Sequence, residues 1–72
     1  MKTEEIMKEI SDIRKNKKIT QECLATEIGK STKFIGDIEI GRRRPSLQTF
    51  IDICEYLKID VNSILYRRDK NE

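Results

Sequence analysis

The segment 21–40 limits the possible folds more than any other, because apolar residues recur in it where two short crossed helices would touch. Gly29 lies at the predicted turn between the helices, where a positive φ is needed and glycine has no Cβ to clash. The residues expected at the contact between the helices are Leu24, Ala25, Ile28, Ile35 and Ile38. This spacing predicts two helices joined by a tight turn.

Capping residues predict the bounds of these two helices. Thr20 can accept a hydrogen bond from a backbone N–H of the following turn, so we expect the first helix to begin at Gln21 and to end at the turn glycine. Ser31 can cap the second helix in the same way, and this helix is expected to span 31–40, with Gly41 as its stop.

Three more helices are expected around this pair. The first should span about 3–15, because Ile6, Ile10 and Ile13 recur at helical spacing and Met7 widens the same stripe. Ser46 can cap a fourth helix. Its predicted apolar face consists of Leu47, Phe50, Ile51, Cys54 and Leu57.

Asp60 can cap a short fifth helix that returns Val61, Ile64 and Leu65 to the core. The fold class is therefore predicted as all-α, a compact domain of five helices over 1–66, followed by a charged C-terminal tail, 67–72. With 72 residues there is room for one domain with a modest core.

Composition argues against several classes of function. No apolar run is long enough to span a membrane and the N-terminus lacks a signal-peptide core, so we expect a cytoplasmic protein. There is no His, which leaves only Cys23 and Cys54 as soft metal ligands and predicts no metal site. We expect Cys54 in the core and Cys23 on an outer face, although a redox switch stays an alternative. No pairing of a nucleophile with a base is visible, so an enzyme is not expected.

Over residues 10–65 the sequence resembles the Cro/C1-type helix-turn-helix repressors, also called the Xre family. The resemblance rests on Thr20-Gln21, Leu24-Ala25, Gly29, Ile35, Ile38-Glu39, the segment 41–47 and the segment 57–61. It implies a lambda-repressor-like DNA-binding domain, in which 21–40 is the helix-turn-helix motif and the helix 31–40 lies in the major groove of double-stranded DNA.

The resemblance also implies which residues contact bases. Ser31, Thr32 and Lys33 lie at the N-terminal end of the recognition helix, where the helix dipole adds to the charge of Lys33. Lys33 can donate to guanine O6 and N7. Asp37 can accept from a cytosine amino group, but a carboxylate near phosphates is repelled unless a cation pairs with it, and pairing is the interpretation we favour.

Phosphate contacts are expected from segments beside the recognition helix. In the resembling family the residue at Gln21 donates to a phosphate, and Arg42, Arg43 and Arg44 follow the recognition helix directly. A solvated loop is the alternative interpretation of the three arginines. In the resembling family, the residues that match Arg14 and Glu39 form a largely buried ion pair. The resemblance therefore implies this pair here.

Some residues depart from the family pattern. Gly36, Asp37 and Ile40 stand where polar or basic residues are common, Lys30 replaces a usually apolar turn residue, and Phe34 is expected to be a packing residue. Gly36 either permits close approach to DNA or is merely tolerated.

The resemblance implies a homodimer that represses transcription at an inverted repeat, with no cofactor and no small-molecule ligand. The apolar candidates for its interface are Ile59, Val61 and Tyr66. The unusual recognition helix leaves one alternative open, a protein-interaction module such as an antitoxin or an accessory regulator.

Overall fold

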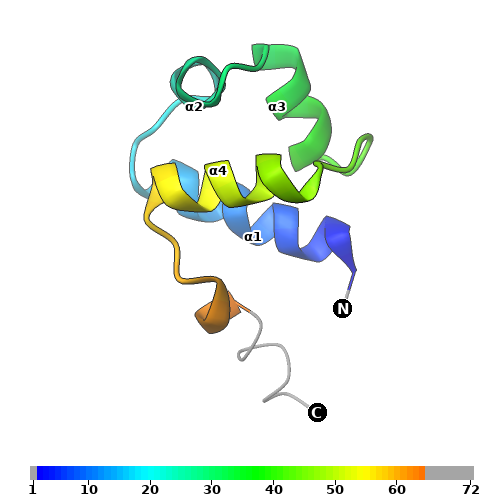
Figure 1. The fold of residues 1–72 in the computed structure, drawn as a ribbon, viewed down its shortest axis with the longest axis vertical. Coiled ribbons are helices and arrows are strands. Elements are labelled where there is room, and N and C mark those ends of the chain that lie inside the picture. Colours follow the sequence, from blue (N-terminus) through cyan, green and yellow to red (C-terminus); the bar gives the residue numbers. More distant parts are fainter. Residues whose placement is uncertain (1, 65–72) are drawn as a thin grey trace.

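The computed structural model describes residues 2–64. This part of the chain contains four helices and one further helical turn, joined by short loops. The helices are α1 (Thr3–Asn16), α2 (Gln21–Ile28), α3 (Thr32–Glu39) and α4 (Leu47–Leu57), and the turn at 61–64 follows them. The all-α fold expected from the sequence is confirmed, since no strand occurs in this range. Figure 1 shows α2 and α3 together at one end of the molecule, with α4 in front of α1 below them.

Side-chain caps explain where the helices begin. Thr20 Oγ1, Ser31 Oγ and Ser46 Oγ accept hydrogen bonds from the backbone N–H groups of residues 23, 34 and 49 at 3.0, 3.0 and 3.1 Å. Each such cap stabilises its helix by about 1 kcal/mol. Because Ser31 and Ile40 are the caps of α3, this helix is one residue shorter at each end than the span 31–40 expected from the sequence.

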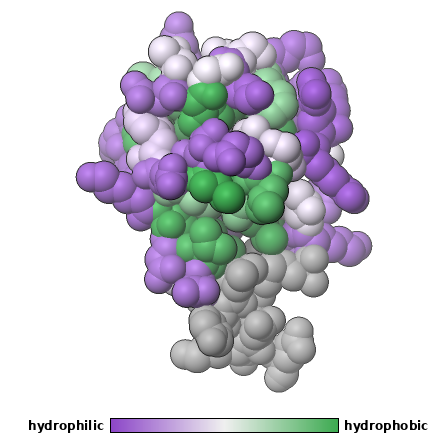
Figure 2. Space-filling view, viewed as in Figure 1, coloured by the Kyte–Doolittle hydropathy of each residue, from purple (hydrophilic) through white to green (hydrophobic). Residues whose placement is uncertain are grey.

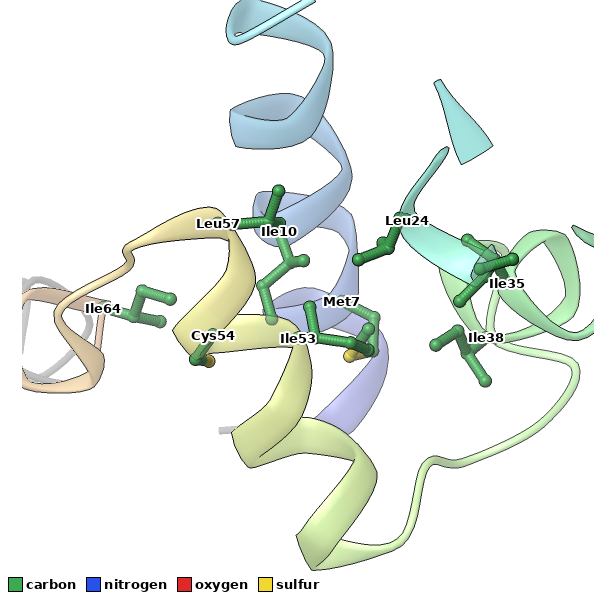
Figure 3. Close-up of a cluster of buried hydrophobic side chains, with 10 residues drawn as sticks. Met7, Ile10, Leu24, Ile35, Ile38, Ile53, Cys54, Leu57 and Ile64 are labelled. Carbon is green, nitrogen blue, oxygen red and sulfur yellow. The ribbon is translucent and has the colours of Figure 1, made fainter. Parts of the chain in front are cut away.

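The core is formed by apolar side chains from all four helices and from the final turn. Figure 3 shows these side chains converging between α1, α4 and the α2–α3 pair. Its fully buried members are Met7, Ile10, Leu24, Ile35, Ile38, Ile53, Leu57 and Ile64. A core of this size is modest, so each helix depends on its neighbours for burial of its apolar face.

The apolar face predicted for α4 is wrong at two positions. Leu47 is 75% exposed and Ile51 is 38% exposed, whereas Ile53, which was not expected in the core, is fully buried. The buried residues of α4 are Thr49, Ile53, Cys54 and Leu57, a stripe rotated from the predicted one. Apolar side chains surround much of this helix, and packing against the other helices decides which of them are buried. Figure 2 shows apolar surface on the face that carries α4.

Asp60 begins the last helical turn, as the sequence predicts. Its Oδ1 accepts a hydrogen bond from the backbone N–H of Asn62 at 3.0 Å, and Ile64 is buried. Val61 and Ile59, two of the candidates for a dimer interface, are partly buried and pack against the core. Leu65, Tyr66 and the tail 67–72 lie outside the described residues.

Within residues 2–64, no helix is both long enough and apolar enough to cross a membrane.

Two glycines with opposite surroundings provide a test of this packing. Gly41 has a φ of +84°, and a Cβ added there would lie 2.9 Å from Cγ of Glu4 in α1. Gly36 lies inside α3, and a Cβ there would meet only the side-chain amide of Gln21, at 3.7 and 3.8 Å.

We expect Gly41→Ala to lower the free energy of unfolding by about 1–2 kcal/mol, because alanine is strained at positive φ. Gly36→Ala is the matched variant and should raise it by about 0.5–1 kcal/mol, because alanine favours the helix. Urea unfolding followed by circular dichroism measures both. Equal stabilities of the two variants would contradict this description of the two sites.

Candidate nucleic-acid interface

The α2–α3 pair is held in one geometry by its turn. Gly29 adopts the left-handed conformation with φ +73°, and the backbone N–H of Lys30 donates to the carbonyl of Ala25 at 2.9 Å, which closes the end of α2. Ser31 then caps α3 directly. The turn therefore leaves only two residues between the C-cap of α2 and the first residue of α3, and it fixes how α3 projects from the domain.

One side of α3 is buried and the other is open. Ile35 and Ile38 are fully buried against the other helices, while Thr32 and Lys33 at the amino end are exposed together with the cap Ser31. Backbone N–H groups at the start of a helix carry partial positive charge. The exposed end of α3 thus combines hydroxyl groups, a lysine and a positive helix terminus, which suits recognition of nucleic acid.

Asp37 lies between two cations, as its predicted pairing requires. Its Oδ2 is 3.1 Å from Nζ of Lys33, one turn earlier in α3, and its Oδ1 is 3.9 Å from Nη1 of Arg42. The Asp37 side chain is only 13% exposed, whereas that of Lys33 is 78% exposed. The carboxylate charge is thereby compensated on the face that would meet phosphates, and Lys33 remains accessible.

The basic loop after α3 is anchored through its backbone. The N–H groups of Arg42 and Arg43 both donate to the carbonyl of Asp37, at 2.8 and 3.3 Å. All three arginine side chains, including that of Arg44, are exposed. The loop therefore exposes three cations directly after α3, and two of them, Arg42 and Arg43, lie near the α3 side chains Asp37 and Phe34.

Gln21 has a different partner from the phosphate suggested by the resemblance. Its Nε2 donates to Oε1 of Glu39 at 2.9 Å, and the side chain is partly buried between α2 and α3. The amide has a second N–H that this bond does not use. The position of Gln21 at the first residue of α2 also leaves its backbone N–H free of intrahelical partners.

Arg14 and Glu39 form a buried ion pair between α1 and α3. The Arg14 Nε lies 2.7 Å from Oε2 of Glu39 and its Nη2 donates to Oε1 at 3.1 Å, while the two side chains are 7% and 5% exposed. Arg14 Nη1 also donates to the carbonyl of Ile19 at 2.6 Å. This bidentate geometry pairs the two charges through parallel, charge-assisted hydrogen bonds.

Sequence reasoning missed Ser11 as a member of this cluster. Its hydroxyl lies 3.2 Å from Oε1 of Glu39, so the carboxylate has hydrogen-bonding partners on α1 and α2. A signal was present, because Ser11 falls on the same helical stripe as Met7, Ile10 and Arg14 and is a polar residue among apolar ones. Sequence reasoning also missed that Lys30 and Arg43 both lie near the ring of Phe34.

The two cysteines are free and differ in their exposure. Cys54 is buried, and burial raises the pKa of its thiol, which keeps it protonated and poorly reactive. Cys23 is exposed on α2. Among residues 2–64 there is no group of three or more potential metal ligands.

Comparison with known proteins identifies the family of this chain. A model of the helix-turn-helix family matches residues 10–64, which includes all four helices but for the start of α1. The chain belongs to the Cro/C1-type helix-turn-helix family. The matched range contains α2 and α3 with the tight turn between them.

Two relatives come from Bacillus phage phi105. The chain is 38% identical over 53 residues to the "ImmF control region 10 kDa protein", and the match covers 74% of this chain and 59% of the relative. It is 39% identical over 56 residues to the "Immunity repressor protein", covering 78% of this chain and 39% of that relative. The chain thus matches less than two thirds of the length of either relative.

We expect Glu39→Ala to destabilise the domain strongly, because the variant leaves the buried Arg14 without its counter-charge. Loss of one partner of a buried ion pair costs roughly 3–5 kcal/mol. The control is Glu27→Ala, which removes an exposed carboxylate from α2 and should change the free energy of unfolding by less than about 0.5 kcal/mol. Thermal unfolding of both variants measures the difference, and similar melting temperatures would contradict a structural role of the cluster.

Proposed function

We propose that this protein binds double-stranded DNA sequence-specifically and regulates transcription, as a repressor. The observation that carries the proposal is the two-sided nature of α3: Ile35 and Ile38 anchor it in the core, while Thr32 and Lys33 project from its amino end. A major groove about 12 Å wide admits a helix presented in this way. The resemblance to a phage immunity repressor supports repression as the regulatory outcome.

In this proposal Ser31, Thr32 and Lys33 contact base edges, with Lys33 donating to guanine. Asp37 accepts from a cytosine amino group only if it gives up part of its pairing with Lys33 and Arg42. Phosphates are bound by Arg42, Arg43, Arg44 and the amino end of α2 at Gln21. We propose that the protein binds this DNA in the cytoplasm, the location expected from the sequence.

We further propose that two copies bind an inverted repeat, because one recognition helix contacts only a few base pairs and a dimer doubles the contacts. The recognition helices would then lie about 34 Å apart, one turn of DNA. Selection of bound sequences from a random duplex pool tests both ideas. An enriched inverted repeat supports the proposal, and enrichment of a single half-site contradicts the dimer.

The competing function is binding of a protein partner. It is favoured by Ile40, which is 69% exposed at the end of α3 although it is a large apolar residue. Failure of the selection to enrich any sequence, with equally weak binding at low and high salt, would support this alternative. Phosphate neutralisation, in contrast, gives a steep salt dependence.

A matched pair of lysine and arginine variants separates base contacts from phosphate contacts. We expect Lys33→Ala to cost about 1–3 kcal/mol on the selected duplex and to relax the preference at one base pair. Arg44→Ala should weaken selected and scrambled duplexes alike and should reduce the slope of log K against log salt by about 0.9. Fluorescence anisotropy measures both quantities. If Lys33→Ala weakened all duplexes equally, its assignment to bases would be wrong.

Replacement of Asp37 tests what its carboxylate does at the interface. We expect Asp37→Asn to strengthen binding to scrambled DNA, because it removes a negative charge near the phosphates and releases Lys33 and Arg42. The preference of the protein for the selected duplex should fall at the same time if Asp37 accepts from cytosine. Unchanged binding to both duplexes would exclude a role of Asp37 at the interface.

A further inference from the structure

The ring of Phe34 brings together two cations from opposite ends of the recognition helix. Lys30, in the turn before α3, has its Nζ 5.5 Å from the ring centroid, and Arg43, in the loop after α3, has its Cζ 5.1 Å from it. Both distances lie within the range of cation–π attraction. Phe34 itself is partly buried and packs against the core, so the ring is a fixed surface.

The partner of Arg43 differs from that of Arg42. Arg42 lies near a carboxylate, Asp37, at 3.9 Å. Within residues 2–64, neither Arg43 nor Lys30 forms an ion pair with a carboxylate, and the aromatic ring is the group that holds them. An aromatic ring attracts a cation without neutralising it and without using its N–H donors.

This difference matters for binding an anion. A guanidinium stacked on a ring keeps its full charge and its fork of donors for a phosphate, while some of its rotamers are already excluded. A long side chain that is partly ordered before binding loses less entropy when it binds. The backbone of the same loop is already anchored on Asp37, which limits the positions that Arg43 can reach.

We propose that Phe34 is a positioning residue, which holds Lys30 and Arg43 as an uncompensated pair of cations for the phosphate backbone beside the recognition helix. The inference rests on the proposed DNA binding and adds two residues, Phe34 and Lys30, to the interface. Lys30 thereby binds phosphate together with Arg43. The role of the pair is independent of base sequence, since it acts through phosphates.

A double-mutant cycle tests the coupling between ring and cations. Phe34→Leu keeps an apolar side chain but removes the ring, and we expect it to weaken binding to selected and scrambled duplexes alike by about two- to fivefold, the range of exposed cation–π contacts. In a Lys30→Gln, Arg43→Gln background the same replacement should have almost no effect. Phe50→Leu, in α4, is the matched control and should leave DNA affinity unchanged.

Each result of this cycle either supports the role of Phe34 or overturns it. An equal loss of affinity from Phe34→Leu in both backgrounds means that the ring acts only through folding, and it overturns the proposal. The same holds if wild type binds DNA and Phe34→Leu binds as tightly. If wild-type protein binds no duplex, the proposed function itself falls, and this inference falls with it.

A second variant avoids any loss of packing. Pentafluorophenylalanine at position 34, introduced by chemical synthesis, keeps nearly the same shape but removes the negative potential of the ring face on which the attraction depends. We expect a loss of DNA affinity similar to that of Phe34→Leu with an unchanged melting temperature. Wild-type affinity in this variant would overturn the proposal even if Phe34→Leu failed to fold.

Discussion

The arrangement of the helices depends most on the ion pair and the hydrogen bonds of the Glu39 carboxylate. It is buried near the end of α3 and accepts hydrogen bonds from Arg14 of α1 and Gln21 of α2, with Ser11 of α1 beside it. A buried charge is costly unless its partners are complete. The geometry that satisfies Glu39 therefore excludes other arrangements of α1, α2 and α3, and the apolar core adds most of the burial energy without that directional requirement.

This constraint reaches the outer surface because α3 is only eight residues long. When Glu39, Ile35 and Ile38 are fixed in the interior, the rotation of the helix is set, and Thr32 and Lys33 must lie on the open side. The loop that follows is tied to the same helix through the carbonyl of Asp37. The buried residues of α3 thus position the cations of α3 and of the following loop, which lie on the surface. A preformed interface requires such positioning.

The sequence predicted local features well and long-range ones less so. The starts of α2 and α4 followed from Thr20 and Ser46, since capping depends on residues three apart. The buried side of α4 did not follow, because two overlapping apolar stripes were available and contacts with distant residues chose the one that contains Ile53. The Gln21 contact with Glu39 and the Arg43 contact with Phe34 both join segments across a turn or loop, where spacing alone carries little information.

We propose that the exposed side of α3 and the loop after it form the DNA-binding surface of this protein. The most direct measurement is a titration of isotope-labelled protein with the selected duplex, followed by amide chemical shifts in NMR spectra. We predict the largest shifts at residues 31–37 and 42–44 and at the amino end of α2, with the exposed residues of α4, Leu47 and Ile51, unaffected. Shifts centred on Leu47 and Ile51, with α3 unchanged, would contradict DNA binding through α3.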